Sequence, residues 1–419
     1  MIDSNMDVII GAGVTGLSYA AFCGHKDYLV LEREDEVGGF CKTTYCNDYV
    51  WDYSGHFFHF RNDDIKKFIM SGIDDRNLVN IKKSTYIKYK DRRIDYPFQK
   101  NIHQLSKKEF IDCLYDLFSA TPQAYHSFKE MLYAKFGKSI AEKFLIPYNT
   151  KLYACDLNTL DKDAMGRFFP YAEREDIVKN FKNSNRTSYN ESFIYPKKGA
   201  ITYIKSLLRH VETSNIRTKC QVVSINPKKK TIKTKTGEVL KYDRLISTIP
   251  IPKLFQMAEI PYDESIYNWN KVLVFNLGFD RIGGDINSHW IYFPESKYCF
   301  YRVGFYSNIL SSERMSLYVE LGFKKTDEIH ADFWLPRVLT DLHKAGIVNN
   351  TQQLVAYESI VMNPAYVHIS SESTEDVRNK KLLLERNQIF SIGRYGSWTY
   401  CSIEDNIIEA QKLANQLNQ

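Results

Sequence analysis

Three glycines near the start of the chain have the type and spacing needed to hold a pyrophosphate. Gly11, Gly13 and Gly16 form a GxGxxG motif between the apolar segment DVII and a run of small residues. The first glycine permits a tight turn, the second lets the backbone approach a phosphate, and the third lets a helix pack closely on a strand. The helix N-terminus then offers N–H groups and a positive dipole end to the phosphates.

A carboxylate completes this pattern. The segment DYLVLE ends at Glu32, 21 residues after Gly11. An acid at the end of the second strand can accept hydrogen bonds from the ribose of an adenosine. Strand, glycine turn, helix, strand and terminal acid, in that order, predict a dinucleotide-binding unit.

A second candidate site lies at YPFQKNI, residues 96–102. Pro97 removes a backbone donor and restricts the residue before it, so the segment is expected to be extended or turn-like. Tyr96 and Phe98 could hold a flat ring while Gln99 reads its polar edge, since an amide both donates and accepts. The two rings could equally pack a core, and the segment alone leaves both interpretations open.

Composition excludes several function classes. The 419 residues carry a formal net charge of +6, which is too dilute for a nucleic-acid-binding surface but compatible with an anionic small molecule. The eight cysteines include no CxxC pair or histidine-spaced cluster, so we expect reduced thiols and no metal site. No apolar run approaches the roughly 20 residues that span a bilayer. We therefore expect a cytoplasmic protein with no membrane segment and, because a strand begins by Asp7, no signal peptide.

A second glycine pair follows the acid, in REDEVGGFCKT. Gly38 and Gly39 in this position resemble the extended FAD signature of the glutathione-reductase-like and amine-oxidase-like flavoproteins. The resemblance implies that the dinucleotide is FAD. The residues expected to bind it are Gly11, Gly13, Gly16, Glu32, Arg33, Gly38, Gly39, Val222, Gly393 and Arg394.

Flavoproteins of that class have an FAD-binding domain built from separate stretches of the chain. We assign residues 1–60, 191–261 and 386–419 to such a domain. Helical spacing predicts a helical insertion domain over residues 61–190, and strand-like segments predict a β-rich substrate domain over residues 262–385. The expected fold class is α/β, with a discontinuous Rossmann-like FAD-binding domain, a helical insertion and a mixed, largely β-sheet substrate domain.

The later stretches contain the strands and helix that this plan needs. Residues 217–250 read as short strands, with the lysine run 228–230 at a turn and Thr236 and Gly237 at the next. A run of lysines at a hairpin turn indicates a solvated turn rather than a nucleic-acid patch. A further strand ending at Gly393 precedes a predicted helix over residues 403–417.

Five short strings spread along the chain resemble those of UDP-galactopyranose mutases, particularly the eukaryotic type. They keep their order and approximate spacing over nearly the whole chain. The strings are YPFQKNI (96–102), YNTKLYA (148–154), NESFIYP (190–196), WIYFPESKYCFYR (290–302) and GRYGSWTY (393–400).

The resemblance implies a role for each part of an active site: uracil contacts near residue 96, diphosphate contacts from an arginine and several tyrosines, and a flavin-facing loop. The implied substrate-binding residues are Tyr96, Phe98, Gln99, Asn149, Tyr153, Asn190, Tyr292, Arg302, Tyr366 and Tyr400. The implied catalytic residues are Gly55, His56, Arg167 and Arg302, with Arg174 as the alternative to Arg167.

The implied reaction interconverts UDP-galactopyranose and UDP-galactofuranose without net redox. FAD is active when reduced, and its central-ring nitrogen attacks the anomeric carbon and expels UDP, which later returns. Such an enzyme needs a UDP-sugar and an external reductant, for which NADPH is the candidate. The sequence does not predict the oligomeric state.

Three alternatives stay open: a mutase acting on another UDP-sugar, a flavin oxidase or desaturase of the amine-oxidase class, and a non-catalytic UDP-binding regulator. Tyr153 stands where the mutase family often has Trp, Ser54 replaces a Gly, and Ile309 lies where a phosphate-contacting Tyr is expected. These departures leave the sugar specificity open.

Overall fold

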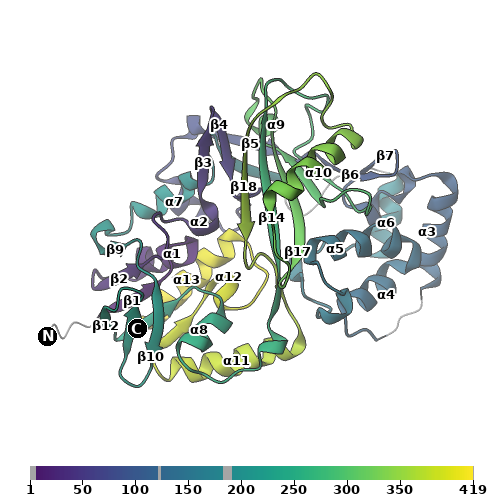
Figure 1. Cartoon of the computed structure of the whole chain (residues 1–419). Helices are drawn as coiled ribbons and strands as arrows, with labels where there is room; N and C mark the ends of the chain where they lie inside the picture. The colour runs from purple at the N-terminus through teal and green to yellow at the C-terminus, as the bar shows by residue number, and fades with distance from the viewer. Residues whose placement is uncertain (1–5, 121–123, 183–190, 419) are drawn as a thin grey trace.

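The computed structural model describes residues 6–120, 124–182 and 191–418. Figure 1 shows a parallel sheet with its helices on the left, a tall, mainly antiparallel sheet in the centre, and a group of helices on the right. The active-site candidates come from all three regions, so the positions of the two sheets decide how those residues meet.

The parallel sheet is covered on both faces. On β1 (Asp7–Ile10), Ile9 packs against α1 (Val14–Phe22), α7 (Ile201–Leu208) and α13 (Ile403–Leu417). Val8 and Ile10 point the other way, toward α8 (Ile251–Met257) and α11 (Ser371–Glu385). This alternation is that of a strand buried on both faces. The strand order is β20 (Ile389–Ser391), β13 (Arg244–Ser247), β1, β2 (Tyr28–Leu31) and β9 (Ile216–Arg217).

A small antiparallel sheet packs against the face of the parallel sheet that carries Val8 and Ile10. It contains β10 (Val222–Asn226), β11 (Thr231–Thr234) and β12 (Val239–Lys241), in that order. Lys228 and Lys229 are exposed in the turn between its first two strands. The predicted strands and the solvated lysine turn are thereby confirmed.

The second large sheet is mainly antiparallel. Its long strand β14 (Asn268–Phe279) points Leu273 and Phe275 toward α10 (Ala331–Lys344), and Val272 and Val274 toward the helical region. Among the described strands of this sheet, β15 and β6 pair in parallel and the other neighbours are antiparallel. The order is β18 (Leu354–Met362), β14, β17 (Ser316–Lys324), β16 (Arg302–Phe305), β15 (Trp290–Tyr292), β6 (Thr85–Tyr89) and β7 (Arg92–Asp95), and β19 (Val367–His368) pairs with β14.

The helices on the right of Figure 1 form the predicted insertion. Buried side chains such as Leu117, Phe128 and Phe136 join them into one core with the second large sheet. A π-helical turn over Ala141–Leu145 continues directly into the helix that ends at Tyr153. The helices are α3 (Lys107–Ser119), α4 (Phe128–Ile140), α5 (Ile146–Tyr153) and α6 (Arg174–Lys182).

The structure differs from the prediction at the start of the helical insertion. After α2 (Asp63–Met70), residues 78–95 form strands, because segments such as TYIKY alternate β-branched and aromatic side chains. Of these strands, β5 (Leu78–Lys82) pairs with β8 (Ser192–Pro196), while β6 and β7 extend the second large sheet. The remaining domain boundaries stay predictions.

Short elements connect the sheets near the candidate site. The hairpin of β3 (Thr43–Cys46) and β4 (Tyr49–Asp52) leads into the loop 52–56. The helices α9 (Tyr306–Leu310) and α12 (Gly393–Gly396) begin one and two residues after the strands β16 and β20. Within the described residues, no helix combines the length and apolar character needed to cross a bilayer.

Candidate active site

The glycine motif forms the turn between β1 and α1. Gly11 has a φ of +102°, which glycine adopts without strain. A Cβ on Gly16 would lie 2.0 Å from the carbonyl oxygen of Gly11, so only glycine lets α1 lie this close to the strand. Gly13 is the N-cap of α1, and no described side chain caps the helix there. The N–H groups of this helix end therefore remain available to an anion.

Glu32 and the second glycine pair enclose this turn. Glu32 is buried at the end of β2, and its Oε2 accepts a hydrogen bond of 2.8 Å from the backbone N–H of Ala12. Gly38 has a φ of +119° and Gly39 a φ of +58°. A Cβ on Gly39 would lie 3.3 Å from the Cα of Gly13. The two glycine segments thus approach each other more closely than larger residues would allow.

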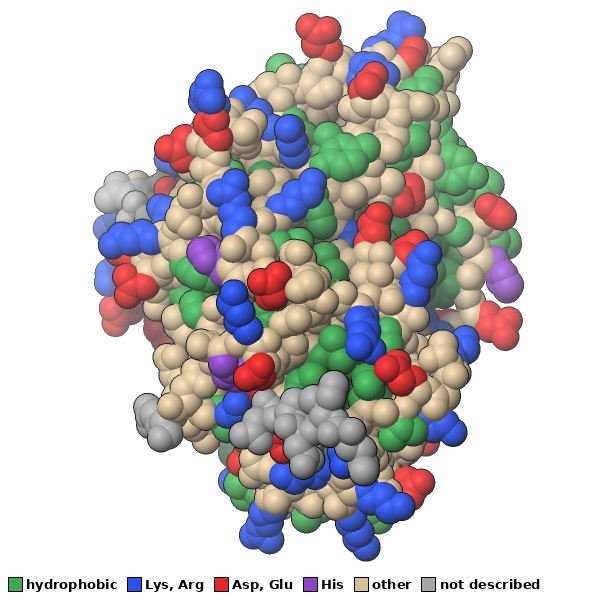
Figure 2. Space-filling model, turned by 90° about the vertical axis from the view of Figure 1, so that its left-hand side faces the viewer, with side chains coloured by type: hydrophobic (Ala, Val, Ile, Leu, Met, Phe, Trp, Pro, Cys, Tyr) green, Lys and Arg blue, Asp and Glu red, His purple; other side chains and the backbone are tan. Residues whose placement is uncertain are grey.

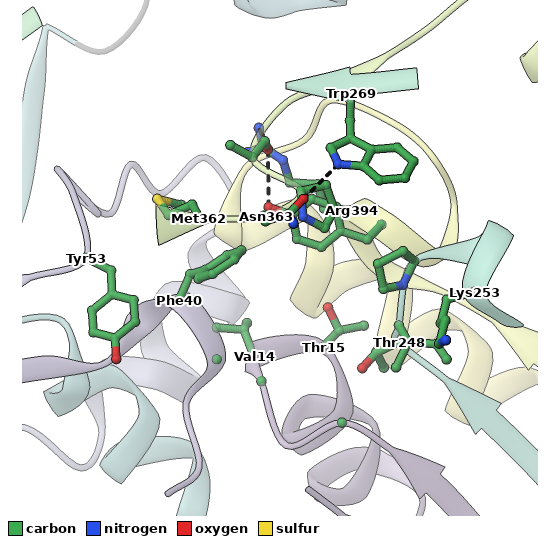
Figure 3. A pocket seen from close by; sticks show the side chains of 18 of the residues that line it. Val14, Thr15, Phe40, Tyr53, Thr248, Lys253, Trp269, Met362, Asn363 and Arg394 are labelled. Carbon is green, nitrogen blue, oxygen red and sulfur yellow. Dashed lines mark hydrogen bonds between the residues drawn. The ribbon is translucent and has the colours of Figure 1, made fainter. Parts of the chain in front are cut away.

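A cavity of about 910 Å³ extends from this cradle to the second large sheet. Figure 3 shows its lining from α1, the loop after β2, the end of β13 and the region of α12. Gly16 and Gly393 only support it: Gly16 lets α1 approach the Gly11 carbonyl, and Gly393 leaves space for the side chain of Thr15. The predicted residues that line it are Gly11, Gly13, Glu32, Arg33, Gly38, Gly39, Gly55, His56, Val222, Arg302, Tyr366, Arg394 and Tyr400.

Arg394 lies in the middle of this cavity (Figure 3). Its guanidinium carbon is 5.1 Å from the ring centroid of Tyr366 and 4.8 Å from that of Tyr400. Its Nε is buried and has no hydrogen-bond partner among the described residues. An unpaired buried donor together with the glycine cradle fits a bound anionic dinucleotide, so these residues are compatible with FAD.

The loop 52–56 brings Gly55 and His56 to the cavity. A Cβ on Gly55 would lie 2.6 Å from the hydroxyl of Tyr318, so the loop packs tightly there. The Nδ1 of His56 is 3.3 Å from the carbonyl oxygen of Ser54. Because a carbonyl only accepts, Nδ1 carries the proton and Nε2 is left as an acceptor. Burial lowers the pKa of His56 to about 4, so the ring is neutral at neutral pH.

Arg302 forms a two-pronged ion pair with Glu320. The two residues lie opposite each other on β16 and β17. Nε of Arg302 is 2.8 Å from Oε2 of Glu320, and Nη2 is 2.6 Å from Oε1. The side chain of Glu320 is 1% exposed and that of Arg302 is 21% exposed. Both line the cavity, and a guanidinium has five N–H donors, so Arg302 keeps donors for a further anion.

Four of the predicted tyrosines form two pairs: Tyr96 and Tyr292 lie near the charge of Arg302, whereas Tyr366 and Tyr400 lie beside Arg394 and line the cavity. The rings of Tyr96 and Tyr292 stack with centroids 4.8 Å apart, and those of Tyr366 and Tyr400 stack at 5.8 Å. Burial raises the pKa of Tyr292 to about 12, while the nearby positive charge of Arg302 opposes this shift. The Tyr292 hydroxyl therefore stays protonated and can donate to an anion.

The predicted uracil contacts are buried to different degrees. Phe98 is fully buried and stacks on Phe144 with centroids 5.2 Å apart, so in this structure it packs a core. Gln99 donates from Nε2 to the carbonyl of Pro170, and its Oε1 has no partner among the described residues. The Oδ1 of Asn149 is also buried without a described partner. Two buried amide oxygens thus lack described partners, but Phe98, Gln99 and Asn149 are all absent from the lining of the cavity.

The two candidate arginines lie in different places. Arg167 forms an ion pair of 2.5 Å with Asp405, in the first turn of α13 and close in sequence to Tyr400. Arg174 instead donates to the carbonyl of Ala120, at the end of α3. Arg167 is therefore the candidate nearer the tyrosines, although neither arginine lines the cavity.

Two further predictions concern the sugar end. Tyr153 is buried beside Tyr366, with ring centroids 5.8 Å apart, and its hydroxyl has no described partner. Asn190 lies outside the described residues.

The sequence interpretation missed Glu320 and Tyr301, which both line the cavity. Glu320 had a signal, because it is an acid inside the apolar strand SLYVELGF. Tyr301 had none, since only the sheet decides which way its ring points.

Comparison with protein families gives one match over most of the chain. The model of the family described as "Flavin containing amine oxidoreductase" matches residues 23–322. FAD is the cofactor of this family's fold, in agreement with the cradle described above.

Solved structures share the whole fold. The crystal structure of reduced UDP-galactopyranose mutase superposes with a TM-score of 0.93 at 22% sequence identity, covering 100% of this chain and 94% of that one. A putative protoporphyrinogen oxidase from Exiguobacterium sp. 255-15 gives a TM-score of 0.79 at 15% identity, covering 100% of both chains. Putrescine oxidase bound to putrescine gives 0.65 at 13% identity, covering 99% of both. At these identities the comparisons establish the fold, and the predicted α/β flavoprotein architecture is confirmed.

Proposed function

Because the chain belongs to the flavin-containing amine oxidoreductase family and binds FAD, we propose that it is a mutase that interconverts UDP-galactopyranose and UDP-galactofuranose. The observation that carries the proposal is the pairing of one FAD cradle with an anion site in the same cavity. That anion site contains Arg302, Tyr366 and Tyr400. A cationic amine would be disfavoured beside a guanidinium, whereas the paired oxygens of a diphosphate suit its N–H donors.

Reduced FAD supplies a nucleophilic ring nitrogen for the anomeric carbon, so the reaction needs a reductant once but has no net redox. The protein residues bind and orient the UDP-sugar around this chemistry. Arg302 donates to the diphosphate with its N–H groups that Glu320 does not occupy. The hydroxyls of Tyr292, Tyr366 and Tyr400 add neutral donors.

The same contacts stabilise UDP when it carries the negative charge of a leaving group. Arg302 and the tyrosine hydroxyls are fixed by stacking and by Glu320, so they need little reorganisation when the charge develops. They also retain UDP for its return, which the ring contraction requires. Tyr96 and Gln99 hold the base, and the second arginine is Arg167.

His56 takes part as a neutral group. Its Nδ1–H donates to the carbonyl of Ser54, so its Nε2 can accept a hydrogen bond from a group in the cavity. Gly55 lets the same loop pack closely against Tyr318 and Phe57, which holds the loop at the cavity. These two residues orient the reacting partners and exclude water rather than supply charge.

Product analysis tests the proposal. The purified protein is reduced with dithionite under nitrogen, mixed with UDP-galactofuranose, and the UDP-sugars are separated by chromatography. Conversion to UDP-galactopyranose that requires reduced flavin supports the proposed reaction. If UDP binds but neither sugar is converted, the reaction on galactose is wrong and another UDP-sugar must be tested. Hydrogen peroxide release with an amine and no UDP binding would contradict the proposal altogether.

A further inference from the structure

Ser54 has an unusual backbone for a serine. Its φ is +152°, a region that residues with a side chain rarely adopt. The residue is 7% exposed and lines the cavity next to Gly55 and His56. A glycine would adopt this backbone more easily, so the hydroxyl of Ser54 must be considered as a functional group.

The hydroxyl donates to Oε1 of Glu320. The same carboxylate oxygen accepts the 2.6 Å hydrogen bond from Nη2 of Arg302. Ser54 and Arg302 therefore share one acceptor atom, inside a site where Glu320 is almost fully buried.

The loop itself does not depend on this hydroxyl. The side chain of Tyr306 donates to the carbonyl oxygens of Asp52 and Ser54, at 3.3 and 3.2 Å. The backbone N–H of His56 also donates to the Ser54 carbonyl, at 2.8 Å. Removing the hydroxyl therefore changes the surroundings of Glu320 while these backbone contacts remain.

We propose that Ser54 is a positioning residue that sets how strongly Arg302 binds a diphosphate, an inference that rests on the proposed function. The hydroxyl donates a hydrogen bond to Glu320 and so stabilises part of the negative charge of its carboxylate. Without it, the carboxylate oxygen has only the guanidinium as a donor, and it holds Arg302 more tightly. A smaller part of the positive charge of Arg302 then acts on the phosphates, and fewer of its N–H groups are oriented toward them.

The test compares UDP with uridine, each titrated into the oxidised FAD-loaded protein and followed by the flavin absorbance. Ser54→Ala is expected to weaken UDP binding about tenfold, the effect of one hydrogen bond to a charged group. Uridine binding should change less than twofold, because uridine has no phosphates for Arg302 to hold. A general structural role would weaken both ligands alike.

Two other variants complete the test. Ser307→Ala removes a buried hydroxyl that has no described partner and does not line the cavity, so it should leave both ligands unaffected. Ser54→Gly removes the hydroxyl and also relaxes the backbone, so it should weaken UDP selectively even if the alanine variant loses FAD.

The outcomes separate this inference from the proposed function. If Arg302→Lys does not weaken UDP binding, the diphosphate site itself is wrong. If Arg302→Lys weakens it and both Ser54 variants bind UDP as the unmodified protein does, the role of Ser54 is overturned. Equal losses for UDP and uridine in Ser54→Gly would also overturn it.

Discussion

At the residue scale, the proton state of His56 has a consequence for stability. Its pKa is lowered by burial to about 4, below the ordinary value of about 6.5. The unfolded chain therefore binds more protons than the folded one between these pH values, so stability is lost as pH falls through that window.

We predict that His56→Asn reduces the loss of unfolding free energy between pH 7.5 and pH 5 by about 1–2 kcal/mol. Urea unfolding at the two pH values measures this difference. The control is His330→Asn, since His330 is 78% exposed in its side chain. An unchanged pH dependence in His56→Asn would show that folding does not shift the pKa of this ring.

The fork of Arg302 leads to a second prediction at this scale. Arg302→Lys keeps a positive charge near Glu320 but loses the paired geometry that suits phosphate oxygens. UDP binding should weaken by about tenfold or more, whereas Arg281→Lys, in an exposed pair with Asp280, should have no effect. Calorimetric titration measures both, and equal affinities would remove Arg302 from the diphosphate site.

At the element scale, the close packing of α1 on β1 depends on the absence of a side chain at Gly16. An added Cβ at Gly16 would meet the Gly11 carbonyl oxygen at 2.0 Å, which is backbone and cannot rotate away. Gly16→Ala should therefore displace α1 and leave the purified protein with little FAD. The ratio of flavin to protein absorbance measures this. Gly284→Ala is the matched control, because a Cβ there meets nothing within 4 Å.

A half-buried lysine, Lys151, joins α5 to the hairpin that carries Arg302. The Nζ of Lys151 lies 2.5 to 3.1 Å from four backbone carbonyls, and it is the only described side chain with such a set of contacts to that segment. It therefore fixes the helix that carries Asn149 against the strands that carry Tyr292 and Arg302. The four carbonyls belong to Phe293, Glu295, Tyr298 and Phe300.

We predict that Lys151→Met lowers the unfolding free energy by about 3 kcal/mol, since it leaves several buried acceptors unsatisfied. Chemical denaturation measures the loss. Lys297→Met, on the same segment but in an exposed pair with Glu295, should change stability by less than about 1 kcal/mol. Equal stability of the two variants would mean that water replaces Lys151.

At the scale of the whole molecule, one cavity is lined by both large sheets. The cradle belongs to the parallel sheet, while Arg302 and Trp269 belong to the second. Figure 2 shows how charged side chains of both signs are mixed over one face of the molecule, without a single-sign field. On that face no single sign of charge would steer an anionic substrate, whereas the cavity itself contains Arg302 and Arg394.

Removing FAD should consequently destabilise the whole chain. A ligand present at 100 times its dissociation constant stabilises by about 2.7 kcal/mol, so the apoprotein should melt several degrees lower. Thermal unfolding followed by tryptophan fluorescence measures this. FMN should not restore the melting temperature, because it lacks the adenosine whose ribose we expect Glu32 to hold; full rescue by FMN would contradict that expectation.

Much of the fold could be predicted from local signals. The positions of Gly11, Gly13, Gly16 and Glu32 specify a strand, turn, helix and strand because each residue has a conformational or hydrogen-bonding reason to be there. The strands at residues 78–95 differ from the prediction, because the helical spacing of later segments, residues 106–118 and 139–153, was extended to the whole of residues 61–190. Their partners lie far away in sequence, at Ser192–Pro196 and Trp290–Tyr292.

The sequence by itself determined the dinucleotide cradle and the order of the site strings, because these depend on neighbouring residues. Only the tertiary structure decided that Glu320 faces Arg302, that Phe98 is buried in a core, and that Arg167 rather than Arg174 lies near Tyr400. The physical reason is that burial and charge pairing act between residues that are distant along the chain. Strand register and helix docking set those contacts, and no local pattern encodes them.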